Sequence, residues 1–140
     1  MADGQDFILQ FDLTPEEIDP SGGANVLFRS HSEGNTDIYC WLAFRDSWWD
    51  IACENRSGDR QIAAGKTSRG ITDRTTTVTL IVSGDEIALY LDGRPVGYGQ
   101  DEDHLTGSGP HFDVYAPQGT TTVDIDNVKF WDLNNLKPEE

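Results

Sequence analysis

The residues with the chemistry to bind a ligand are concentrated in one aromatic stretch, between Ile38 and Glu54. This stretch holds two indoles, a guanidinium and a carboxylate, at Trp41, Trp48, Arg45 and Asp50. Indole rings stack on the apolar faces of pyranose rings, while charged groups fix sugar hydroxyls through directed hydrogen bonds. These residue types predict a carbohydrate-binding surface, provided that one structural element brings the four side chains to the same face.

A β-hairpin that turns at Asp46 and Ser47 is the element expected to do this. Its register opposes apolar residues in three pairs: Phe44 with Trp49, Leu42 with Ile51, and Cys40 with Cys53. Because side chains alternate along a strand, these pairs face the core and the four candidate residues lie on the other face. Two alternatives stay open: Arg45 covers Trp48 as a cation–π pair without a ligand, or the aromatic side chains belong to the core.

The two cysteines occupy directly opposed positions of this hairpin. Cβ atoms at such positions lie roughly 4.5–5.5 Å apart, which is near the range that a disulfide requires. A disulfide between Cys40 and Cys53 would indicate an oxidising compartment, and therefore an extracellular or cell-surface protein. Two reduced cysteines in the core are the alternative. The first residues show no signal peptide, which we expect in a longer precursor.

The charge of the chain limits its partners. The 140 residues include 25 acidic and 10 basic side chains, for a net charge of −15. Such a surface repels phosphate groups, which argues against nucleic acid as a partner, and no apolar run is long enough for membrane insertion. Solubility explains the acidity in the ordinary way. A bound Ca²⁺ is the alternative, with carboxylate ligands from Asp101, Asp103, Asp124 and Asp126, although their spacing matches no known cation-binding loop.

Catalysis has little support in the sequence. The three histidines lack the spacing of a metal motif, and there is no Gly-x-Ser-x-Gly elbow and no P-loop. Asp124 and Asp126 alternate on one segment, as the carboxylates of some retaining glycosidases do, but no flanking glutamates or aromatic residues indicate a cleft. We therefore expect a protein that is not an enzyme, with a glycoside-processing activity as an alternative.

The remaining pattern predicts an all-β fold. Asp6 to Leu13 alternates as a half-buried strand, and Thr76 to Leu91 reads as a hairpin that turns at Gly84. Further strands recur every eight to twelve residues or so, whereas no window has the period of an amphipathic helix. The polar segment 14–23 is expected to connect two strands with one helical turn. The prediction is a two-sheet antiparallel β-sandwich, as one domain over residues 1–140 with its core at about 6–133.

Two segments carry a resemblance to a known family. The stretch from Val78 to Val96, followed by an acidic loop and then Val123 to Trp131, resembles the concanavalin A-like, laminin-G-like jelly-roll domains of bacteria. This family includes lectin-like and carbohydrate-binding modules, sensor domains and some glycoside-processing enzymes. The resemblance implies a jelly roll with ligands on a concave sheet face or at the loop rim. An additional N-terminal segment of the relatives is missing here, which predicts an open sheet edge.

These observations together predict a non-catalytic module of a larger protein, which binds carbohydrate or another extracellular ligand, a protein included. The expected ligand-binding residues are those of the hairpin together with two tyrosines of later strands: Trp41, Arg45, Trp48, Asp50, Tyr90 and Tyr115. The alternative is a structural module that assembles with another chain, or into an oligomer, through its open edge.

Overall fold

The computed structural model describes residues 6–55, 58–67, 74–102 and 107–135, which form ten β-strands and one short 3₁₀ helix. The first five strands are β1 (Phe7–Glu17), β2 (Gly23–Glu33), β3 (Thr36–Phe44), β4 (Trp48–Asn55) and β5 (Gly58–Lys66). The later elements are β6 (Thr76–Ser83), β7 (Glu86–Leu91), β8 (Arg94–Gln100), β9 (His111–Tyr115), β10 (Thr122–Asp132) and the helix η1 (Leu133–Asn135).

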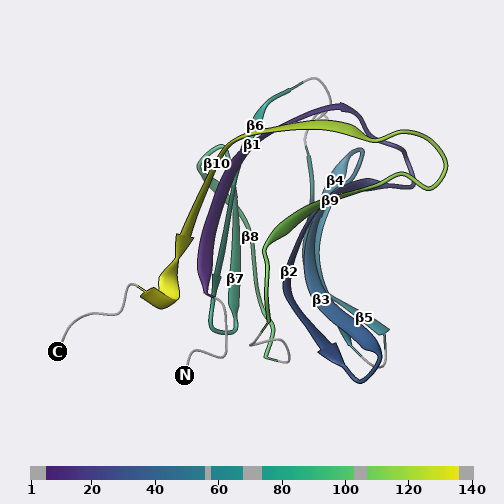
Figure 1. Ribbon diagram of the computed structural model, residues 1–140. Helices are drawn as coiled ribbons and strands as arrows, with labels where there is room; N and C mark the ends of the chain where they lie inside the picture. The colour runs from purple at the N-terminus through teal and green to yellow at the C-terminus, as the bar shows by residue number, and fades with distance from the viewer. Residues whose placement is uncertain (1–5, 56–57, 68–73, 103–106, 136–140) are drawn as a thin grey trace.

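The strands form two antiparallel sheets of five strands each, which pack face to face (Figure 1). Sheet A has the order β10-β1-β6-β7-β8, and sheet B has the order β5-β4-β3-β2-β9. The expected all-β, two-sheet antiparallel sandwich is therefore confirmed. Among the described residues no helix is long and apolar enough to cross a membrane.

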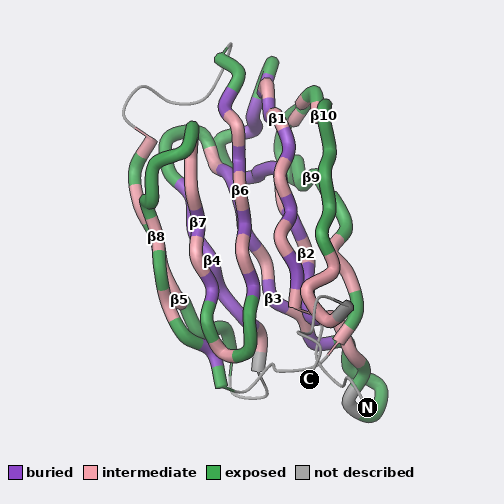
Figure 2. The backbone as a smooth tube through the Cα atoms, turned by 90° about the vertical axis from the view of Figure 1, so that its left-hand side faces the viewer, coloured by how far each residue is buried: buried purple, intermediate pink, exposed green. Residues whose placement is uncertain are grey.

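The core lies between the sheets and is filled by alternate side chains of the central strands. On β1 the inward residues are Phe7, Leu9, Phe11 and Leu13, and their counterparts on β6 are Val78, Leu80 and Val82. Burial of each large apolar side chain contributes about 1.5–3 kcal/mol to stability. Figure 2 shows this alternation on β6, in contrast to the exposed edge strands β8 and β10.

Residues 14–17 extend strand β1, so the helical turn predicted for segment 14–23 is wrong for these residues. Thr14 pairs with Asp124, and Pro15 pairs with Val123 of β10. Strand β6 pairs with β1 only as far as Leu13, so Pro15 has a neighbouring strand on one side alone. A proline lacks the N–H that a central strand requires, but it fits an edge, and pairing with β10 keeps this segment extended.

The two long sides of the sandwich differ in how closely the sheets approach. On the side of β5 and β8, Gly97 and Gly99 allow the sheets to pack closely. A Cβ atom on Gly97 would collide with the indole of Trp49, and one on Gly99 would collide with Ile62. Because these two glycines have no side chain, the two sheets are in contact along this side.

The opposite side, between β9 and β10, remains open and apolar. Its inward-facing side chains are 38–52% exposed: Phe112 and Val114 on β9, Val128 and Phe130 on β10. Phe112 packs edge-on against Phe11, and Phe130 stacks on Phe7, with ring centroids 5.0 and 5.8 Å apart, so each contacts the core on one face only. We call these four residues the open side.

Candidate functional site

The hairpin of β3 and β4 has the register predicted from the sequence. Cys40 pairs with Cys53, Trp41 with Ala52, Leu42 with Ile51, Ala43 with Asp50, and Phe44 with Trp49. Beyond the last pair, the N–H of Arg45 donates to the carbonyl oxygen of Trp48 over 2.8 Å. Because alternate pairs face opposite ways, the four candidate residues lie together on the outer face of sheet B.

A row of five residues crosses this outer face at one end of the sheet. From β9 to β5 it consists of Tyr115, Gly23, Arg45, Trp48 and Lys66. Gly23 lies between Tyr115 and Arg45, and a Cβ atom there would lie 2.7 Å from the carbonyl oxygen of Phe44 and 3.5 Å from Cδ of Arg45. We call this set the aromatic row, because two exposed rings stand on it with small or cationic residues between them.

Trp48 is the best exposed aromatic residue of the hairpin, with 39% of its surface accessible to solvent. The guanidinium carbon of Arg45 lies 5.4 Å from the centroid of its ring, which is within the range of a cation–π contact. Lys66 is directly opposite Trp48 on the neighbouring strand β5. Arg45 thus covers part of the indole and Lys66 occupies the paired position on β5, while part of the indole surface remains available for a ligand.

Asp50 lies behind the aromatic row and connects Trp41 to Arg45. The residue is only 5% exposed, and its carboxylate accepts a hydrogen bond of 3.3 Å from Nε1 of Trp41 and lies 3.5 Å from Nε of Arg45. Burial raises the pKa of Asp50, and the nearby Arg45 and the hydrogen bond from Trp41 offset only part of this effect. Asp50 therefore positions Arg45 and Trp41 and is too buried to offer much surface to a ligand.

Trp41 is partly buried and is held from two directions. Besides its bond to Asp50, its ring lies 5.9 Å from that of Tyr39, measured between centroids, and it covers Ala52. Burial, followed by the negative charges of Glu54 and other carboxylates, raises the pKa of Tyr39. The far end of the same face forms a cavity of about 410 Å³, lined by Tyr39, Leu27, His31 and His111 among others. The outer face of sheet B thus offers aromatic surface at both ends.

The structure brings one of the two predicted tyrosines to this face. Tyr115 belongs to the aromatic row, as expected. Tyr90 of β7 pairs with Thr79 and Pro95, alternates with the buried Leu89, and so lies on the outer face of sheet A, away from the hairpin.

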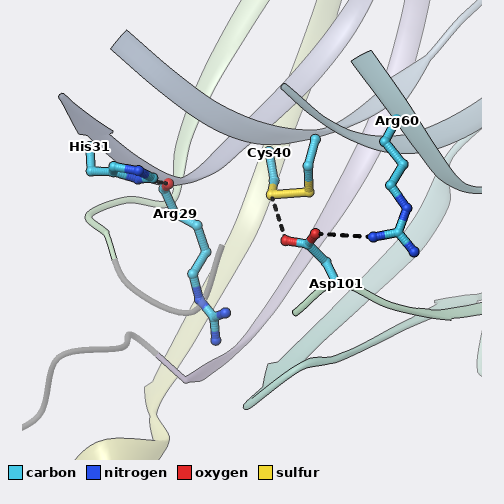
Figure 3. Close-up of a disulfide and its surroundings, with 6 residues drawn as sticks. Arg29, His31, Cys40, Arg60 and Asp101 are labelled. Carbon is cyan, nitrogen blue, oxygen red and sulfur yellow. Dashed lines mark hydrogen bonds and ion pairs between the residues drawn. A yellow bond between two sulfur atoms is a disulfide. The ribbon is translucent and has the colours of Figure 1, made fainter. Parts of the chain in front are cut away.

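The carboxylates considered for Ca²⁺ do not form one site. Asp101 is buried after β8, where its Oδ2 lies 3.9 Å from Sγ of Cys40 and its Oδ1 lies 3.6 Å from Nη1 of Arg60 (Figure 3). Asp124 and Asp126 are on β10, at the other edge of sheet A. Asp103 lies outside the described residues.

Asp124 and Asp126 have a neighbour that the sequence did not reveal. Together with Asp12 of β1 they line a cavity of about 290 Å³. The two oxygens of Asp12 accept hydrogen bonds of 2.7 Å from Asn127 and 2.8 Å from Thr77, and these bonds lower its pKa. Asp12 therefore holds β1, β6 and β10 together, which gives its carboxylate a structural role.

The disulfide between Cys40 and Cys53 is present, which confirms this prediction (Figure 3). The bond joins β3 to β4 at the end of the hairpin away from the turn. All four candidate residues of the hairpin lie between the two cysteines in the sequence.

Lys66 was not among the candidate residues indicated by the sequence. The structure shows it as the last residue of β5, in register with Trp48. The basic residue at the end of a segment of strand length was the available signal, but the sequence did not show which strand it pairs with.

Comparisons with known proteins bear on the fold. No family model and no curated protein matches the sequence. Among solved structures, the chain is similar to a carbohydrate binding module, CBM66, of Bacillus subtilis, with a TM-score of 0.67 and 20% identity over 91% of this chain and 75% of that one. Sheep galectin-11 in complex with glycerol gives 0.63 and 9% over 90% of each chain.

An enzyme has the same architecture. The marine PL7 alginate lyase AlyA1 of Zobellia galactanivorans matches with a TM-score of 0.55 and 15% identity, over 94% of this chain and 63% of the lyase. Binding modules and enzymes thus share the layer arrangement seen here. The protein therefore has a two-sheet jelly-roll β-sandwich fold, which it shares with these solved structures.

Proposed function

We propose that the protein binds carbohydrate without catalysis, through the aromatic row on the outer face of sheet B. The observation that carries this proposal is the exposed indole of Trp48, which contacts Arg45 and is in register with Lys66 on the outer face of sheet B. A sugar ring stacks on the free part of the indole, and the neighbouring cationic groups donate hydrogen bonds to its hydroxyl oxygens. Tyr115, beyond Gly23 in the same row, offers a second exposed ring on which a further sugar unit stacks.

The fold comparisons and the disulfide support this proposal. Proteins named as a carbohydrate binding module and as a galectin have the same fold. A disulfide is typical of proteins in oxidising compartments, which agrees with an extracellular or cell-surface location.

We favour binding over catalysis because the carboxylates considered for catalysis either lie away from the aromatic row or are buried. Asp124 and Asp126, the pair considered for a glycosidase, lie on the sheet opposite the aromatic row, beside an Asp12 whose oxygens are both hydrogen-bonded. Asp50 lies next to the aromatic row, but it is buried against Arg45.

A glycan array, followed by tryptophan fluorescence titration of the hits, tests the proposal. Replacing Trp48 with alanine should weaken binding by about 1–3 kcal/mol if the indole is the central contact. Trp131 is the matched control, since it is 43% exposed but lies on the outer face of sheet A. Trp131→Ala should bind as the wild type does. Equal affinity of a folded Trp48→Ala variant and the wild type would refute the proposed site.

The open side favours a second candidate function, the recognition of another polypeptide. Within the part of the chain that the structure describes, the outer edges of β9 and β10 have no partner strand, and their apolar side chains are half exposed. These strands also carry four carboxylates, at Asp113, Asp124, Asp126 and Asp132. The occupant that fits is an extended segment that alternates apolar and basic residues and adds to the edge as a further strand.

A further inference from the structure

Basic residues gather at one end of a strongly acidic molecule. The chain has only 10 basic residues, and four of them, Arg45, Lys66, Arg74 and Arg94, lie at the end of the sandwich that carries the aromatic row. Lys66, Arg74 and Arg94 line one cavity of about 460 Å³. This volume is within the range of cavities that hold small ligands.

The cavity lies between the end of β5 and the adjacent ends of β6, β7 and β8. Lys66 enters it from sheet B, and Arg94 enters it from the start of β8 in sheet A. Leu91 and the buried Thr76 contribute the apolar and polar parts of its wall. Because Lys66 is also in register with Trp48, the cavity begins beside the aromatic row.

Among the described residues that line the cavity, Asp92 carries a carboxylate, and this carboxylate is engaged. Oδ2 of Asp92 lies 3.0 Å from Nη2 of Arg74, and its Oδ1 accepts a hydrogen bond of 2.9 Å from the N–H of Thr77. Asp50 is paired with Arg45, while Asp46 is exposed in the hairpin turn. Within the described residues, no carboxylate forms an ion pair with Lys66 or Arg94. Two cationic groups thus remain for an external anion.

We propose that the ligand is an acidic saccharide, and that Lys66 and Arg94 bind its carboxylate or sulfate group in this cavity. This inference rests on the proposed function, because the sugar ring that bears the anionic group stacks on Trp48. An ammonium group and a guanidinium form charge-assisted hydrogen bonds with the oxygens of a carboxylate or sulfate. These hydrogen bonds are stronger where a cavity excludes part of the solvent. The net charge of −15 repels an anionic glycan elsewhere on the surface, so the anion is directed to this end of the molecule.

Matched pairs of glycans separate the role of the anion from that of the sugar. The first pair is a uronic acid oligosaccharide and its carboxyl-reduced form, and the second is a sulfated galactan oligosaccharide and its desulfated form. Titration calorimetry should show that the wild type prefers at least one anionic member over its neutral counterpart, by about tenfold, since two exposed ion pairs contribute modestly. The preference should decrease as salt is added.

Variants then assign the preference to the two residues. The double variant Lys66→Gln, Arg94→Gln should lose the preference and bind the anionic and neutral members of each pair with equal affinity. Lys129→Gln, on β10 at the far edge of sheet A, is the matched control and should keep the preference. Thermal unfolding of each variant verifies that it is folded.

The possible outcomes separate this inference from the proposed function. If the wild type binds both members of each pair equally, the acidic saccharide is wrong. If the double variant retains the preference, Lys66 and Arg94 are wrong as the residues that bind the anion. In both cases binding at Trp48 stands. If no glycan binds, or if Trp48→Ala binds every glycan as the wild type does, the proposed function fails and this inference fails with it.

Discussion

At the scale of single residues, Asp19 shows how one carboxylate joins two distant connections of the chain. Its oxygens accept hydrogen bonds from the backbone N–H groups of Gln118, over 2.8 Å, and Ser21, over 3.1 Å. Its own N–H donates to Oγ1 of Thr121. The bond from Gln118, followed by that from Ser21, holds the pKa of Asp19 below its ordinary value of 3.8. Asp19 thus connects the segment between β1 and β2 to the segment between β9 and β10.

The lowered pKa predicts a pH-dependent effect of Asp19→Asn. Because the folded state favours the ionised form, this group stabilises the protein fully well above pH 3.8 and loses its contribution as the pH falls through its lower folded value. The variant should therefore have a lower melting temperature than the wild type at pH 7, and the difference should shrink below pH 3.8. Circular dichroism melts across pH 3–7 measure it. Asp113→Asn, on the exposed strand β9, is the control, and a difference that stays constant with pH would contradict the prediction.

At the scale of elements, the contact between β8 and β4 depends on a glycine. Gly97 lies against the indole of Trp49, which is fully buried, and Gly65 of β5 lies against another part of the same ring. The large side chain fills the space that the two glycines leave between the sheets. This contact fixes β8 against β4, which begins with Trp48. It therefore also fixes one wall of the cavity that is lined by Lys66 and Arg94.

Replacing Gly97 with alanine should destabilise the protein by about 1–3 kcal/mol, because the added methyl group overpacks the site against Trp49. The cost should be smaller in a Trp49→Phe background, where the ring is smaller. Urea denaturation of the four proteins of this double-mutant cycle gives the coupling energy. Gly119→Ala serves as control, since its Cβ atom would lie 3.5 Å from its nearest neighbour, Cγ of Asp19. Equal costs of Gly97→Ala in both backgrounds would show that Trp49 is not the obstacle.

Local pairing explains which elements the sequence could predict. The β3–β4 hairpin is joined by a short turn, so alternation alone placed Trp41, Arg45, Trp48 and Asp50 on one face. Tyr90 was placed wrongly relative to the hairpin because its strand belongs to the other sheet, and no local signal reports which sheet a strand joins. The row from Tyr115 to Lys66 likewise depends on pairings between strands that are distant in sequence.

At the scale of the whole molecule, the sandwich is closed on one side, at β5 and β8, and open on the other, between β9 and β10. The four apolar residues of the open side are framed by acidic ones, so a second copy of this chain would bring like charges together. This balance favours a basic, extended partner over self-association.

A peptide of about ten residues that alternates valine and lysine should therefore bind the open side, and the same peptide with glutamate in place of lysine should not. Val128→Lys should weaken this binding, because it places a cation within the apolar part of the site. Fluorescence anisotropy of labelled peptides gives the affinities, and sedimentation gives the oligomeric state of the protein alone. Equal binding of the two peptides, or of neither, would contradict this partner, and a stable oligomer would identify a second copy as the occupant.

The disulfide described above encloses the whole aromatic hairpin. Residues 40–53 form a covalent macrocycle that contains Trp41, Arg45, Trp48 and Asp50, the four residues predicted from the sequence. When the sandwich unfolds under oxidising conditions, these side chains remain on one ring and within a few residues of each other. The hairpin residues of the proposed site are therefore kept together by a covalent bond even without the rest of the fold. In contrast, Lys66, Arg94 and Tyr115 join them only when the two sheets are assembled.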